Sequence, residues 1–159
     1  MFIDVLGLQY DGDTLNKKGL GGSESATILL ARELAKIGFD VTIFNDCEGK
    51  DCASGLFNNV LYLPITQYNL DNSGSFDVII SLRSLRPFAS DEFKHYIKKY
   101  NTDVCFKNII KKCKKKCLLA HDTFIEGDNL VEHFVETGLI DEIFTLSDFH
   151  TNYIANCDH

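Results

Sequence analysis

The 159-residue sequence has no long hydrophobic run and no basic segment at its start. No stretch approaches the roughly 18 apolar residues that a membrane-spanning helix needs. The first eight residues lack the positive charge of a signal peptide, and Asp4 interrupts their apolar run. We therefore expect a cytoplasmic protein whose six cysteines are reduced and serve mainly as small apolar residues.

Basic residues are few and unevenly placed. The net charge is −7, and six of the 16 lysines and arginines lie between Lys107 and Lys116, a window without an acid. The rest of the chain is strongly acidic, which argues against nucleic-acid binding, because that binding requires a broad basic face. The lysine cluster is typical of a solvated helix end and turn. Its alternative is a patch that makes a peripheral contact with an anionic membrane or touches an anionic acceptor.

Short apolar runs without polar alternation are separated by helix-like segments. This pattern indicates parallel strands covered by helices on both faces. We therefore predict an α/β fold, a Rossmann-like doubly wound parallel sheet, in a single domain over residues 1–159. The predicted strands are 2–8, 41–45, 60–63, 78–82, 117–121 and 143–146. The predicted helices are one that follows Gly22, then 90–99, 102–112, 129–137 and 148–155.

A glycine-rich segment, Lys18-Gly19-Leu20-Gly21-Gly22-Ser23-Glu24, precedes the first long helix. Glycine permits positive φ and close approach of a ligand, and a helix start offers N–H donors and a positive dipole end. The segment indicates either a phosphate site or a turn that glycine merely permits. Gly38 is the predicted stop of the helix. The apolar stripe predicted to be buried is Ala26, Leu29, Leu30, Leu34 and Ile37.

Two known glycine loops fit poorly. A dinucleotide-binding loop follows its strand directly and has a third glycine, whereas here residues 9–20 intervene and the third glycine is missing, although Asp46 stands about where a ribose-binding acid would. A P-loop requires Gly-Lys-Ser/Thr, which is absent. Cys113, Cys117 and His121 have metal-like spacing, but a strand would hold the last two roughly 13 Å apart. We therefore predict no metal site.

Two arginines, Arg83 and Arg86, follow the strand predicted at 78–82. Ligands of parallel sheets bind at the carboxyl ends of strands, and arginine recognises phosphate and carboxylate groups well. The pair therefore indicates an anionic ligand, or else surface ion pairs with Asp91 or Glu92.

Three polar residues follow the last two predicted strands. His121 and Asp122 stand where an imidazole could reach a ligand while the carboxylate orients it or caps the next segment. A structural role for the histidine is the alternative. Ser147 most simply caps the helix predicted to start at Asp148.

The glycine segment, together with residues 34–42, 76–83, 119–122 and 144–147, resembles the N-terminal half of a family 4 glycosyltransferase. The order and spacing match across nearly the whole chain, although Phe39 replaces a histidine usual in that family. The resemblance implies the two-domain GT-B architecture, in which the N-terminal domain mostly binds the acceptor. The C-terminal domain supplies most of the nucleotide-sugar site, and this sequence stops before any such domain.

The resemblance also implies roles for individual residues. Gly21 and Gly22 would donate N–H groups to the donor diphosphate, His121 would lie at the reacting sugar, and Arg83 and Asp122 would bind substrate. Glu24 would bind substrate on the acceptor side. The implied reaction is sugar transfer with retention, in carbohydrate biosynthesis, with a glycan or lipid acceptor, no cofactor and no obligatory metal.

We expect the isolated chain to be inactive. One alternative is a free-standing Rossmann-like module for a phosphorylated metabolite or dinucleotide. Another is a non-catalytic interaction protein that uses the lysine cluster.

Overall fold

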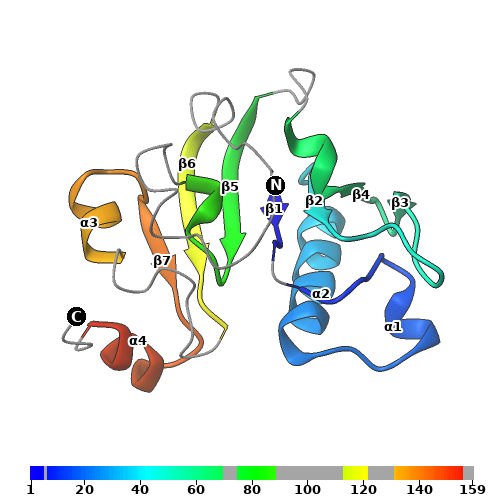
Figure 1. The fold of residues 1–159 in the computed structure, drawn as a ribbon, viewed down its shortest axis with the longest axis horizontal. Helices are drawn as coiled ribbons and strands as arrows, with labels where there is room; N and C mark the ends of the chain where they lie inside the picture. The colour runs from blue at the N-terminus through cyan, green and yellow to red at the C-terminus, as the bar shows by residue number, and fades with distance from the viewer. Residues whose placement is uncertain (6, 70–74, 89–112, 122–130, 156–159) are drawn as a thin grey trace. The chain divides into compact units, whose positions relative to one another are not determined.

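The computed structural model describes residues 1–5, 7–69, 75–88, 113–121 and 131–155 (Figure 1). The chain forms two compact units, Met1–Tyr68 and Asn69–His159, which we call the N-terminal and C-terminal units. Within the described residues, no helix is long and apolar enough to cross a membrane.

The N-terminal unit contains four strands in the order β3-β4-β2-β1. Two of its three strand pairings are parallel, β1 with β2 and β2 with β4, while β3 pairs antiparallel with β4. Its strands are β1 (Phe2–Ile3), β2 (Val41–Asn45), β3 (Gly55–Phe57) and β4 (Val60–Pro64). Its helices are α1 (Thr14–Lys17), α2 (Gly22–Lys36) and the 3-10 helix η1 (Ile65–Asn69).

Helix α2 ends where glycine was predicted to stop it. Gly38 has φ of +98°, the left-handed conformation that glycine adopts without steric cost. The N–H of Phe39 donates to the carbonyl of Leu34 at 3.1 Å, and the N–H of Gly38 donates to the carbonyl of Ala35 at 3.1 Å. These two bonds form a Schellman motif, which satisfies the last carbonyls of the helix.

The predicted buried stripe of α2 is wrong. Leu29, Leu30 and Ile37 are 52%, 40% and 72% exposed. The helix packs on β2 and β4, and its buried residues are Glu24, Thr27, Ile28 and Ala31. Both faces of α2 carry apolar residues, so periodicity alone did not distinguish them. The face with the small residues Thr27 and Ala31 lets the helix approach the strands closely.

The described residues of the C-terminal unit form three strands in the order β5-β6-β7, all parallel. The strands are β5 (Phe76–Leu82), β6 (Cys113–Leu119) and β7 (Glu142–Phe144). The helices are α3 (Val131–Glu136), α4 (Asp148–Ala155) and the 3-10 helix η2 (Arg86–Phe88). The α/β class and the largely parallel pairing are confirmed, whereas coverage of both faces and a single domain stay predictions. The helices predicted at 90–99 and 102–112 lie outside the described residues.

Strand β6 starts four residues earlier than predicted, so Lys114, Lys115 and Lys116 lie on a strand rather than on a helix end. Lys114 Nζ lies 2.6 Å from Asp77 Oδ1, and Lys115 pairs with Glu142 across to β7. Lys116 Nζ donates to the carbonyl of Gly138 at 2.7 Å. Cross-strand ion pairs offset the repulsion that three consecutive lysines would otherwise cause. The other three lysines of the cluster, Lys107, Lys111 and Lys112, lie outside the described residues.

Candidate functional site

The glycine segment does not use positive φ at Gly19, Gly21 or Gly22, contrary to the expectation from sequence. Gly21 is the N-cap of α2, with φ of −61° and ψ of 159°, which other residues also adopt. Any other residue at this position would displace the carboxylate of Glu24. A Cβ at Gly21 would lie 2.3 Å from Oε2 of Glu24, far inside van der Waals contact.

Glu24 is buried beneath the start of α2, with 4% of its surface exposed. Its Oε1 accepts a hydrogen bond from the N–H of Leu8 at 3.2 Å, which ties the segment after β1 to the first turn of the helix. The side chain therefore has a structural function here. Its substrate-binding role stays a prediction.

Gly22 begins the helix and is open to solvent. Apart from its chain neighbours and the backbone of the helix itself, nothing lies within 4 Å of the position its Cβ would occupy. The first hydrogen bond of the helix runs from the N–H of Ser25 to the carbonyl of Gly21, at 3.0 Å. The N–H groups of Gly22 and Ser23 thus have no acceptor within the helix, and Gly21 has no side chain to cap them. These two donors form an exposed positive end.

A buried pair that the sequence reasoning overlooked, Asp4 and Tyr10, follows β1. The hydroxyl of Tyr10 donates to Oδ2 of Asp4 at 3.2 Å. Burial, followed by the charge of Asp4, raises the pKa of Tyr10 well above its ordinary value of 10.0. In the sequence, this pair was indicated only by the position of Asp4, a charged residue inside an apolar run.

In the C-terminal unit, Arg83 and His121 leave neighbouring strands at the same edge. Leu82 of β5 pairs with Leu119 of β6, and the N–H of Arg83 donates to the carbonyl of Leu119 at 3.1 Å. His121 follows two residues later, and both side chains are half-buried. Arg83 has φ of +57°, a left-handed conformation that is uncommon outside glycine.

The remaining predicted site residues divide by position. Gly21, Gly22 and Glu24 belong to the N-terminal unit, and Arg86 begins η2 in the C-terminal unit. Asp122 lies outside the described residues, as do Asp91 and Glu92.

Ser147 caps α4 as predicted. Its Oγ accepts a hydrogen bond from the N–H of His150 at 3.2 Å. Its carbonyl accepts a further bond from the N–H of Thr151 at 2.9 Å. The capping role accounts for this residue.

The described cysteines are free thiols. Burial raises the pKa of Cys47 to about 12, and it also raises the pKa of Cys52, Cys113 and Cys117. Thiols with raised pKa are poor nucleophiles at neutral pH, because the thiolate is the reactive form. Among the described residues, no three His, Cys, Asp or Glu side chains gather as a metal site would require.

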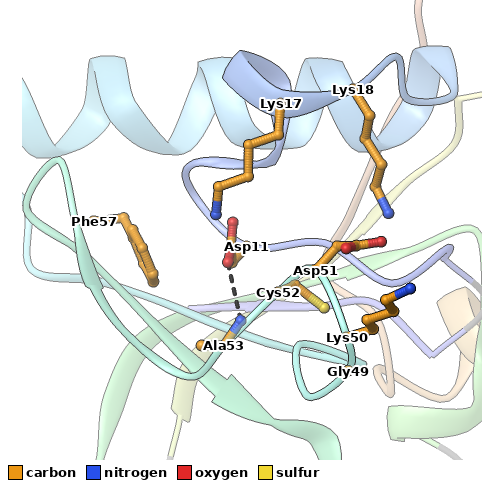
Figure 2. Close-up of a pocket in the computed structure, with 9 residues that line it drawn as sticks. All are labelled: Asp11, Lys17, Lys18, Gly49, Lys50, Asp51, Cys52, Ala53 and Phe57. Atoms are coloured by element: carbon orange, nitrogen blue, oxygen red, sulfur yellow. Dashed lines mark hydrogen bonds between the residues drawn. The ribbon is translucent and has the colours of Figure 1, made fainter.

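A pocket of about 730 Å³ lies in the N-terminal unit, and the sequence reasoning did not predict it (Figure 2). Asp11, Lys17, Lys18, Phe57 and the loop 49–53 line it. Its residues come from segments more than thirty positions apart, so no local motif could signal it.

Together these elements define an α/β protein with Rossmann-like, mostly parallel strand pairing. No family model, curated protein or solved structure matches this chain.

Proposed function

We propose that this chain is the N-terminal, acceptor-side domain of a retaining GT-B glycosyltransferase. It would act with a C-terminal domain that binds the nucleotide-sugar donor, and would present a glycan or lipid acceptor for sugar transfer. The open start of α2 carries this proposal, because it offers the N–H groups of Gly22 and Ser23 without a side-chain cap.

The chemistry of sugar transfer gives these donors a role. Cleavage of a sugar–phosphate bond places negative charge on the departing diphosphate. Preorganised N–H groups and the positive end of a helix stabilise such charge without reorganisation during the reaction. An open N-terminus on a helix of 15 residues suits this task.

The two predicted phosphate-binding glycines are not equivalent. The carboxylate of Glu24 covers Gly21, and its charge would repel a phosphate on that side. Gly22 faces open space. We therefore propose that the N–H groups of Gly22 and Ser23 bind the diphosphate. Gly21 instead leaves room for the side chain of Glu24.

Arg83 and His121 would serve the reacting sugar and the acceptor. Their positions at the carboxyl ends of adjacent parallel strands are typical of ligand-binding residues in such folds. The left-handed backbone of Arg83 adds support, because strained backbone is enriched at functional sites. Asp122, the next residue after His121, is proposed to contact substrate as well.

A titration of the isotopically labelled chain with pyrophosphate and with nucleoside-diphosphate sugars tests the phosphate role by NMR. We expect weak, saturable shifts at the amides of Gly22 and Ser23, and no sugar transfer by residues 1–159 alone, because in the proposed architecture a separate C-terminal domain anchors the donor. Shifts that avoid both amides would contradict the assignment. Tight binding of NAD or of a nucleotide sugar would instead support a free-standing binding module.

Gly22→Asp is the sharpest variant. An aspartate in the first turn favours the helix through its dipole, so the fold should be retained while the added charge repels pyrophosphate. Gly22→Asn has nearly the same shape without the charge and should retain most of the binding. Glu24→Gln keeps an acceptor for Leu8 and removes a charge, so it should strengthen binding. Equal affinities in all three variants would remove the electrostatic basis of the proposal.

A further inference from the structure

The pocket of the N-terminal unit has the size of a small-molecule site. Its volume of about 730 Å³ lies within the range usual for such sites. Its walls are the segment from Asp11 to Lys18 on one side and the loop 49–53 on the other, with the ring of Phe57 from β3 at one end (Figure 2). It includes neither Gly21 nor Gly22.

Asp11 fixes the two walls against each other. It is buried, with 1% of its surface exposed, and its Oδ2 accepts a hydrogen bond from the N–H of Ala53 at 2.9 Å. Its Oδ1 accepts bonds from the N–H of Asp13 at 2.9 Å and the hydroxyl of Thr14 at 2.8 Å. Because both oxygens are occupied by protein donors, Asp11 shapes the pocket more than it repels an anion.

The loop wall has its own internal bonds. The N–H of Gly49 donates to the carbonyl of Cys52 at 3.2 Å, which closes the turn that carries Lys50. From outside, the amide of Gln9 donates to the carbonyl of Glu48 at 3.4 Å and to Asp46 at 3.0 Å. The loop is thus held in place rather than formed around a ligand.

Three lysines line the pocket, and two of them could bind a ligand through their ammonium groups. Lys17 pairs with Asp13 at 3.1 Å, and this hydrogen bond raises the pKa of the lysine. Lys18 and Lys50 form no ion pair with another described residue. They extend from opposite walls on the same side of the pocket, and in this view the carboxylate of Asp51, the other acid of the lining, lies between their ammonium groups (Figure 2).

We propose that this pocket binds a soluble phosphomonoester the size of a sugar phosphate. The phosphate would contact the ammonium groups of Lys18 and Lys50 in place of the carboxylate of Asp51, since a phosphomonoester carries close to two negative charges at neutral pH and the carboxylate only one. The ring of the ligand would lie against Phe57. The site goes beyond the glycosyltransferase assignment, because none of its residues belongs to α2 and it stands if that assignment fails.

Calorimetry of the full chain with inorganic phosphate, a hexose 6-phosphate and the uncharged hexose tests the site. We expect the hexose phosphate to bind more tightly than inorganic phosphate, and the uncharged hexose to show no binding. Lys18→Gln and Lys50→Gln should each weaken hexose phosphate binding at least about fivefold, because each removes a charged donor. Lys36→Gln, a matched control on α2 whose lysine pairs with Glu33, should leave binding unchanged.

Two further variants separate the ring from the phosphate. Phe57→Leu should weaken binding of the hexose phosphate and not of inorganic phosphate, while Asp51→Asn should strengthen both. Gly22→Asp should change neither, which keeps this test distinct from that of the diphosphate site. Unchanged affinity in both Lys18→Gln and Lys50→Gln would overturn the proposal, as would NMR shifts from the hexose phosphate that map to Gly22 and Ser23 alone.

Discussion

The carboxylate of Asp11 accepts a hydrogen bond from the N–H of Ala53, 2.9 Å away in space and 42 positions away in sequence. This contact joins the segment before α1 to the loop between β2 and β3. Two local donors, Asp13 and Thr14, hold the carboxylate in place for this bond, and hydrogen bonds to charged groups exceed those between neutral groups.

Asp11→Ala should therefore destabilise the protein markedly. Three donors would lose their acceptor inside the fold, and we expect a loss of about 3 kcal/mol in the free energy of unfolding. Urea denaturation followed by circular dichroism measures this loss. Asp13→Ala is the control, because that side chain bonds only exposed partners, and it should cost clearly less. Equal losses would show that Asp11 does not join the two segments.

The two glycines at the start of α2 should respond oppositely to alanine. Gly21→Ala would drive a Cβ into Glu24 and break its bond to Leu8, at a cost of about 1–2 kcal/mol. Gly22→Ala enters open space and should raise stability by about 0.5 kcal/mol, because alanine favours the helix. Chemical denaturation of both variants tests the contrast. If Gly21→Ala proved neutral, the buried position of Glu24 would be wrong.

Ile28 and Leu30 should differ sharply although they stand two positions apart. Ile28 is fully buried against the strands, so Ile28→Ala should cost about 2–4 kcal/mol through lost contacts and a cavity. Leu30→Ala removes a side chain that is 40% exposed and should cost less than about 0.5 kcal/mol. Thermal and urea unfolding both report the difference. If Leu30→Ala destabilised the protein more than Ile28→Ala, the buried face of α2 would be the one predicted from periodicity.

Stability should fall at alkaline pH, in part through Cys47. Its pKa is about 12 in the folded protein against an ordinary value of 9.0. The thiol therefore stabilises the fold fully below pH 9, and this contribution is lost as the pH rises toward 12. Once the unfolded thiol is ionised, the expected slope from this residue is about 1.4 kcal/mol per pH unit.

Denaturation of the reduced protein between about pH 8 and 10.5 measures that slope, a range chosen around the ordinary thiol pKa. In Cys47→Ala the free energy of unfolding should fall less steeply with pH, by the slope that corresponds to one proton, whatever the stability of this variant at neutral pH. The buried tyrosines contribute to the loss only at higher pH, because their ordinary pKa is 10.0. Parallel curves for the two proteins would refute a role for Cys47.

Local signals predicted the longer described elements, but the strand predicted at 2–8 ends at Ile3, and the short elements α1 and β3 were not predicted. Strand β2 and helix α4 match the predicted bounds, because Val41–Asn45 is rich in β-branched and aromatic residues and Ser147 is a strong cap. The start of β6 was missed, because a run of three lysines is not typical of a strand. Lys114 and Lys115 are accommodated there by ion pairs with Asp77 and Glu142. Those partners lie more than twenty positions away, so no sequence window contains them.

The site was less predictable than the fold. The glycine segment was found because glycines before a helix are a local pattern, but the difference between Gly21 and Gly22 depends on where Glu24 folds. The pocket was missed because its two walls, which carry Lys18 and Lys50, lie more than thirty positions apart in sequence and are joined by the hydrogen bond between Asp11 and Ala53. The relation of the glycine segment to Arg83 and His121 stays a prediction.

The antiparallel strand β3 has a consequence for solubility. Asn58 and Asn59 have φ of 50° and 62°, the left-handed pair of a tight hairpin, so the chain reverses at once from Phe57 to Val60. The hairpin covers the outer edge of β4 with a strand of only three residues. An exposed edge this short is a poor template for intermolecular strand pairing, and this side of the N-terminal unit is thereby protected against aggregation.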